Sequence, residues 1–151
     1  MKEISLINHF KGALGLRFFG LGPNLKPTNG LSKLQKLLDT NAFWAKGRTI
    51  NDLKTCLANS DVVISLWVGN EIVGFGRALT DGIYRGVLWD IVIDQNHQGK
   101  GFGKLIVKQL LSSEKVKNTK KLYLMTTNKT LFYSQLDFKE VTSQNLLIRE
   151  I

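Results

Sequence analysis

One junction in the sequence limits the possible folds more than any other. There an apolar run typical of a strand ends in a glycine-rich turn, and a helical pattern of apolar residues begins directly after it. The apolar run covers residues 88–93, and residues 98–104 hold three glycines and two lysines. Beyond the turn, apolar side chains recur at helical intervals to about Ser113, at Phe102, Leu105, Ile106 and Leu110. The sequence therefore predicts bare backbone between a strand and the start of a helix. Such a junction exposes several N–H groups and the positive helix end, which favours an anion.

Three strands joined by tight turns are expected before this junction, at residues 61–68, 71–80 and 86–94. The first two runs are separated only by Gly69 and Asn70, and this connector is typical of an antiparallel hairpin. A second turn is expected near Asp81 and Gly82. Two glycines inside the middle run, Gly74 and Gly76, predict a bulge or a close neighbour.

The N-terminal third is predicted to hold a strand at 15–22, a loop with both prolines, and two amphipathic helices at 31–39 and 49–60. Thr49 is a candidate N-cap of the second helix, with Asp52 at its third position. Both helices are expected to cover one face of the sheet.

The C-terminal third is predicted to continue with a buried strand at 121–125 and a short helix within 128–138. Thr127 or Asn128 is placed to cap this helix. Strand-like patterns follow at 138–141 and 145–151.

Length and composition bound the class of protein. With 151 residues and 43% hydrophobic content, the chain is expected to form one globular domain. The single cysteine, Cys56, excludes an internal disulfide and a thiolate zinc site. Because there is no secretory signal and no apolar run of ~20 residues, we expect a cytoplasmic protein without a membrane partner.

The chain is strongly basic, with a formal net charge of +9. Seven lysines and a single acid, Glu114, lie between Gln98 and Lys121, so positive potential is concentrated at and after the glycine-rich turn. An anionic partner and a solvated helix face both remain open as explanations.

Two known phosphate-binding motifs fail at the turn. A Walker A loop needs Ser or Thr after its Gly-Lys pair, but Leu105 follows Gly103 and Lys104. A dinucleotide fingerprint needs a third glycine where Lys104 stands. A pyrophosphate held by backbone N–H groups remains compatible with the turn.

The hexamer at 98–103 resembles the Gln/Arg-x-x-Gly-x-Gly/Ala signature of the GCN5-related N-acetyltransferases (GNAT). The segment LFYSQLDF at 131–138 is similar to the family's Tyr-x-x-Leu-Gly-Phe segment, and the order of elements over 15–151 agrees. The sequences of these two segments most resemble those of the small cyanobacterial and plastid branch, which includes plant serotonin N-acetyltransferases. The resemblance implies one N-acetyltransferase domain over 1–151.

The implied fold is α+β, with three layers (α/β/α) around a mixed, mainly antiparallel sheet of six or seven strands. In this fold the strand before the glycine-rich loop and its neighbour splay apart.

The resemblance also implies acetyl-CoA as co-substrate and no metal. The backbone before the turn would bond the pantetheine arm, and the turn would donate N–H groups to the pyrophosphate. An N–H of Ile91 or Val92 could polarise the acetyl carbonyl. The implied cofactor-binding residues are Ile91, Val92, Ile93, Gln98, Gly99, Lys100, Gly101, Phe102, Gly103, Lys104 and Asn128.

Tyr133 matches the family tyrosine that protonates the departing thiolate. Asp90 lies two residues before Val92, on the same side of the strand, where it could take a proton from the acceptor through water, bind the ammonium, or make a structural hydrogen bond. Asp137 replaces a glycine at a left-handed position. Thr126 stands where many relatives have a cofactor-contacting asparagine, for which Asn128 is a candidate substitute.

The resemblance implies a primary amine as acceptor, either a small molecule such as an arylalkylamine or a protein amino group. Residues 23–29 and 43–48 are expected to select it, and an aromatic pocket could include Phe43, Trp44, Trp67, Phe75 and Trp89. Two alternatives are a non-catalytic acyl-CoA sensor and a basic nucleic-acid-binding module, although no nucleic-acid motif is present. The oligomeric state is not legible from the sequence, and a homodimer, which is common among relatives, remains open.

Overall fold

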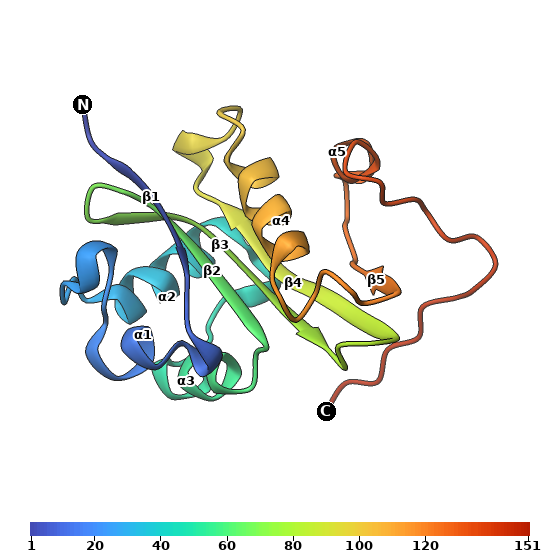
Figure 1. The fold of residues 1–151 in the computed structure, drawn as a ribbon, viewed down its shortest axis with the longest axis horizontal. Coiled ribbons are helices and arrows are strands. Elements are labelled where there is room, and N and C mark those ends of the chain that lie inside the picture. Colours follow the sequence, from blue (N-terminus) through green and yellow to red (C-terminus); the bar gives the residue numbers. More distant parts are fainter.

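The computed structural model describes residues 1–151 and is built on one five-stranded sheet in the order β1-β2-β3-β4-β5 (Figure 1). β1 to β4 pair antiparallel and β5 joins β4 in parallel, which confirms the mixed, mainly antiparallel sheet. The expected six or seven strands are corrected to five. The strands are β1 Ile4–Asn8, β2 Val62–Val68, β3 Glu71–Thr80, β4 Arg85–Ile93 and β5 Lys121–Tyr123.

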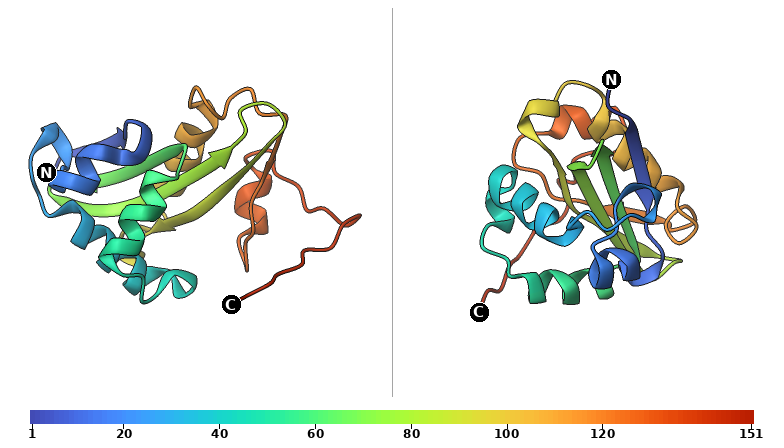
Figure 2. Two further views of the ribbon diagram at one scale, coloured as in Figure 1. Left: turned by 90° about the horizontal axis from the view of Figure 1, so that it is seen from below. Right: turned by 90° about the vertical axis from the view of Figure 1, so that its left-hand side faces the viewer.

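Helices cover both faces of the sheet, which confirms the three layers (Figures 1 and 2). On one face lie α1 (Leu14–Phe19), α2 (Gly30–Asn41) and α3 (Ile50–Ala58), packed on a core that includes Trp67 and Phe75. On the other face α4 (Phe102–Ser112) packs on a second core. A short helix, α5 (Thr130–Ser134), follows β5. Single 3-10 turns occur at Lys11–Ala13, Pro23–Leu25, Phe43–Ala45 and Gln95–His97.

The helices predicted at 31–39 and 49–60 are confirmed as α2 and α3. Leu34, Leu37 and Leu38 of α2 are buried against the sheet. Thr49 caps α3, because its hydroxyl accepts a hydrogen bond from the backbone N–H of Asp52 at 3.1 Å.

A β-bulge in β4 changes which face its side chains occupy. Phe75 pairs with Val92 but Arg77 pairs with Trp89, so β4 carries one extra residue in this stretch. Leu88 packs in the core beneath α4, whereas Val92, four residues later, packs in the core beneath α2 and α3. Regular alternation would place both on the same face, so the bulge exchanges the two faces at Asp90.

Close packing of α4 on β3 explains the two glycines in β3. A Cβ at Gly74 would lie 2.7 Å from Ile106 Cδ1, and a Cβ at Gly76 would lie 2.9 Å from Ile106 Cγ2. β3 also carries an extra residue beside Gly74, because Leu66 of β2 pairs with Gly74 but Trp67 pairs with Ile72. Both predicted features, the bulge and the close neighbour, are therefore present in β3.

The parallel pairing of β4 with β5 is short. It joins only Arg85, Gly86 and Val87 to Lys121, Leu122 and Tyr123. The rest of β4 has no strand partner on this side, which is the predicted splay.

Three secondary-structure predictions at the ends of the chain are wrong. Residues 15–22 include most of helix α1 rather than a strand, because Leu16 is buried at a helical position and Gly20, with φ of 60°, ends the helix. The strand β1 at the N-terminus was not predicted. Residues 138–141 and 145–151 form no strand, since the chain turns away from β5 and finds no neighbouring strand to bond (Figure 1).

No helix in the structure combines the length and the apolar character needed to cross a bilayer.

Candidate active site

A cleft of about 930 Å³ opens where β4 and β5 diverge. One wall is the unpaired part of β4 from Leu88 to Ile93, and the other is the segment from Leu124 to Lys129 together with α5. The glycine-rich turn and the first residues of α4 close one end. The cleft therefore joins the three segments that the sequence singled out.

Nearly all of the predicted site residues line this cleft. Lys100 is the exception, because its side chain lies outside the lining and is exposed. The predicted residues that line the cleft are Asp90, Ile91, Val92, Ile93, Gln98, Gly99, Gly101, Phe102, Gly103, Lys104, Asn128 and Tyr133.

The glycine-rich turn presents backbone rather than side chains to the cleft. Gly99 and Gly101 have φ of 77° and 82°, a left-handed conformation that other residues adopt only at a cost. A Cβ at either position would meet no protein atom within 4 Å, so the space outside them is open to a ligand. Gly101 is the N-cap of α4 and no side chain caps that helix end. The first N–H groups of an 11-residue helix therefore remain available, and this cradle fits a pyrophosphate.

Polar contacts hold the turn against its surroundings. Gln98 Nε2 donates to the carbonyl oxygen of Ile93 at 3.3 Å. Asn41, at the end of α2, accepts a hydrogen bond from the N–H of Gln95 at 2.9 Å. His97 Nδ1 lies 2.9 Å from Asp94 Oδ2, and His97 lines the cleft beside the turn. Sequence reasoning assigned no role to Asn41 or to the Asp94–His97 pair.

Tyr133 lies on α5 with its ring packed edge-on against Phe132 and Phe138, at centroid distances of 4.9 and 6.0 Å. Burial raises the pKa of Tyr133 above its ordinary value of 10.0. The phenol therefore stays protonated at neutral pH, which is the state that a proton donor requires.

The start of α5 differs in detail from the prediction. Its N-cap is Lys129, and neither Thr127 nor Asn128 caps the helix with its side chain. The hydroxyl of Thr126 accepts a hydrogen bond from the N–H of Lys129 at 3.0 Å, which closes the turn before α5 but leaves the helix without a side-chain cap. Asp137 has φ of 67°, so the predicted left-handed position is confirmed.

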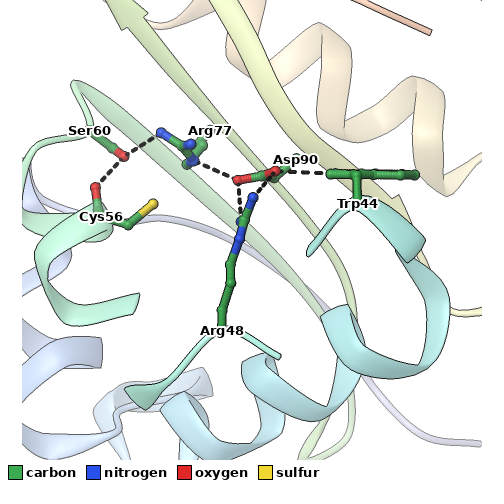
Figure 3. Close-up of polar contacts among 6 residues, drawn as sticks. All are labelled: Trp44, Arg48, Cys56, Ser60, Arg77 and Asp90. Atoms are coloured by element: carbon green, nitrogen blue, oxygen red, sulfur yellow. Dashed lines mark hydrogen bonds and ion pairs between the residues drawn. The ribbon is translucent and has the colours of Figure 1, made fainter. Parts of the chain in front are cut away.

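Asp90 is the centre of a buried charge cluster at the bulge (Figure 3). Its φ is 54° and its side chain is only 3% exposed. Arg48 donates to both carboxylate oxygens, from Nη1 to Oδ2 at 2.8 Å and from Nη2 to Oδ1 at 3.1 Å. Arg77 Nε donates to Oδ2 at 2.8 Å, and Trp44 Nε1 donates to Oδ1 at 3.2 Å.

The two arginines change the acidity of Asp90. Burial alone would raise the pKa of the carboxyl group, but hydrogen bonds and charges from Arg48 and Arg77 outweigh it and hold the pKa below the usual value. The same contacts raise the pKa of Arg48. The cluster is therefore fully charged at neutral pH.

No strong signal in the amino-acid sequence marks these two arginines as site residues. Arg48 lies 42 residues from Asp90 in the chain, in the loop before α3. Arg77 was recognisable only as a charge inside the otherwise apolar strand β3.

The predicted aromatic pocket divides between the cleft and the core. Phe43, Trp44 and Trp89 line the cleft. Trp67 and Phe75 are buried in the core beneath α2 and α3. Of the two segments expected to select the acceptor, 43–48 therefore reaches the cleft, whereas 23–29 contributes no lining residue.

Comparisons with known proteins identify the family. The family model described as "Acetyltransferase (GNAT) domain" matches residues 58–140, more than half of the chain. An N-acetyltransferase of Pyropia yezoensis named ycf52 is 32% identical over 113 residues, which are 72% of this chain and 64% of that protein. GCN5-related N-acetyltransferase 1, chloroplastic, of Arabidopsis thaliana is 32% identical over 75% of this chain and 59% of that protein. The chain thus spans less than two thirds of the length of these relatives.

Solved structures show the same fold. An acetyltransferase of the GNAT family from Xanthomonas campestris matches with a TM-score of 0.73 and 16% identity, over 100% of this chain and 95% of that chain. A Mycobacterium tuberculosis protein in complex with CoA matches with a TM-score of 0.62 and 19% identity, over 76% of this chain and 69% of that chain. The predicted similarity to the plastid branch is confirmed by the curated relatives. The chain belongs to the GNAT family of acetyltransferases.

Proposed function

We propose that this protein transfers the acetyl group of acetyl-CoA directly to a primary amine. The observation that carries the proposal is the cleft between the splayed β4 and β5, which ends at the uncapped start of α4 and its glycine-rich turn. An extended arm can lie along the free edge of β4, and a pyrophosphate can bind the N–H groups of Gly99 to Lys104. Lys104 adds a positive charge to the same end of the cleft.

The reaction needs no covalent enzyme intermediate. The amine nitrogen attacks the carbonyl carbon of the thioester, the new C–N bond forms and the C–S bond breaks. We infer that an N–H of Ile91 or Val92 binds the carbonyl oxygen as negative charge develops on it. Tyr133 gives its proton to the departing thiolate, the amine loses one proton to solvent, and the Tyr133 phenolate takes a proton back from solvent.

Two classes of acceptor are candidates, a small amine and a protein amino group. A small amine, such as an arylalkylamine, fits the aromatic side chains of Phe43, Trp44 and Trp89 at the cleft. A protein amino group is the other candidate, since a relative of Glycine max is named histone acetyltransferase. The net charge of +9 favours the small amine, because lysine-rich tails would be repelled. For location, we propose the cytoplasm, with a plastid as the alternative because the Arabidopsis relative is named chloroplastic.

Two measurements, carried out one after the other, test the proposed function. In a thermal-shift experiment, acetyl-CoA at 100 times its Kd is expected to stabilise the protein by about 2.7 kcal/mol. Thiol release is then followed with arylalkylamines, polyamines and lysine peptides. Turnover with an amine supports the transferase. Binding without turnover of any amine indicates an acyl-CoA sensor, and no stabilisation would contradict both.

A further inference from the structure

The cluster around Asp90 ties three parts of the molecule together at the acceptor side of the cleft. Trp44 belongs to the 3-10 turn Phe43–Ala45, Arg48 to the loop that follows it, and Arg77 to β3. All three donate hydrogen bonds to the carboxylate of Asp90 in β4 (Figure 3). Arg77 Nη1 also donates to Ser60 Oγ at 3.4 Å, and Ser60 Oγ donates to the carbonyl oxygen of Cys56 in α3 at 2.8 Å.

The carboxylate of Asp90 has no oxygen left for an acceptor ammonium. Oδ1 accepts from Trp44 and Arg48, while Oδ2 accepts from Arg48 and Arg77. Two positive charges on one negative charge leave this corner with a net charge of +1, which repels a cation. Asp90 is also the sole carboxylate among the residues that line the cleft.

The cleft is also lined by four other titratable side chains, whose suitability as proton acceptors depends on their charge and position. Lys104 and Lys129 are cations. His97 lies in the 3-10 turn that follows the end of β4, beside the glycine-rich turn, and its Nδ1 is hydrogen-bonded to Asp94. Tyr133 stays protonated. At the bulge itself, all the hydrogen bonds that the Asp90 carboxylate accepts come from protein groups, so Asp90 is not free to take a proton from the acceptor amine.

We propose that Asp90, Arg48, Arg77 and Trp44 form a latch that positions the acceptor wall of the cleft, and that the acceptor enters as its uncharged free base. Asp90 and both arginines are then positioning residues rather than catalytic ones. The latch fixes the indole ring of Trp44 and the bulge that carries Ile91. This proposal rests on the proposed acetyl transfer, and it competes with the sequence-based hypothesis that Asp90 removes the proton.

The pH dependence of kcat/KM distinguishes a latch from a base. Two acceptors with the same ring but different acidity are suitable: 2-phenylethylamine, an aliphatic amine with a pKa of about 10, and phenylalaninamide, an α-amine with a pKa of about 8. If the free base is the substrate, kcat/KM rises with pH up to the pKa of each amine, so the two profiles differ by about two pH units. In Asp90→Asn both midpoints stay in place while kcat/KM falls about tenfold or more. One midpoint common to both amines that disappears in Asp90→Asn would overturn the proposal.

A protease experiment tests the latch without any turnover. Trypsin cleaves after Lys46 and Arg48, on the loop that the latch holds. Release of the loop in Asp90→Asn is expected to speed cleavage there about tenfold. Asp61→Asn is the control, because Asp61 is a half-buried carboxylate whose partners are the backbone N–H of Thr80 and the ammonium of Lys115, and none of them belongs to this loop. Equal cleavage rates in all three proteins would overturn the latch, whereas loss of turnover with the latch intact would count against the proposed transfer alone.

Discussion

Ile106 of α4 lies so close to Gly74 of β3 that a Cβ on the glycine would be 2.7 Å from Ile106 Cδ1. Ile106 is fully buried, so its methyl group has no open space into which it can move. We expect Gly74→Ala to lower the free energy of unfolding by about 1–3 kcal/mol, measured by urea denaturation.

A double-mutant cycle tests the cause of that loss. Ile106→Val removes the nearer of two clashing methyl groups, the other being Ile93 Cδ1 at 2.9 Å, and alone should cost about 1 kcal/mol. In the Gly74→Ala background the same change should cost less or even stabilise the protein, because it relieves the clash. Strictly additive effects would show that the contact is not the reason for the glycine.

The glycine-rich turn offers a matched pair of substitutions. Gly101 and Gly82 both have φ of 82° and both have open space where a Cβ would stand. Alanine at either position costs a similar backbone strain of about 1–2 kcal/mol. We expect only Gly101→Ala to weaken acetyl-CoA binding, by about tenfold or more in calorimetric titration, because it alone fills the cradle. Equal affinities in the two variants would remove the turn from the binding site.

Tyr133→Phe keeps the ring that packs on Phe132 and Phe138 but removes the acidic hydroxyl. We expect kcat to fall by about 100-fold or more while the Kd for acetyl-CoA stays unchanged. Tyr84→Phe, at an exposed turn, is the control and should keep full activity. Unchanged kcat in Tyr133→Phe would reject its role as the proton donor.

His9 makes the stability of the fold depend on pH. Its Nε2 lies 2.7 Å from Ser65 Oγ, which also accepts a hydrogen bond from Trp67 Nε1 at 2.8 Å. Burial lowers the pKa of His9 from 6.5 to about 4. Between these values the unfolded chain binds more protons than the folded chain, so stability falls as the pH falls from 6.5 to 4.

The effect of His9 is measured against a variant that cannot titrate. The wild type should lose up to about 3 kcal/mol more than His9→Gln between neutral pH and pH 4, as followed by urea denaturation at each pH. Parallel pH profiles for the two proteins would show that another group controls the acid sensitivity.

The site was predictable from sequence where its geometry is local. The turn from β4 into α4 could be recognised because its parts are close together in the sequence. The apolar strand, the glycines and the apolar residues at helical spacing lie within about 25 residues of one another. The hairpin at Gly69 and Asn70 is local in the same sense. Helix α1 was mistaken for a strand because six residues carry too little periodicity to separate the two.

The latch could not be predicted because it is built from distant residues. Arg48 and Asp90 are brought together only when α2 and α3 pack on the sheet. The left-handed conformation of Asp90 and the exchange of faces at the bulge also depend on the register between β3 and β4. The C-terminal segments have strand-like composition, yet a strand forms only where a neighbouring edge accepts its hydrogen bonds.

The central claim is that CoA binds with its pyrophosphate on the backbone of the glycine-rich turn. The most direct test is titration of ¹⁵N-labelled protein with CoA, followed through the backbone amide resonances. Saturable shifts that are largest at Gly99, Gly101, Gly103 and Lys104 are the predicted result. Binding that leaves these four amides unmoved, or no binding at all, would contradict it.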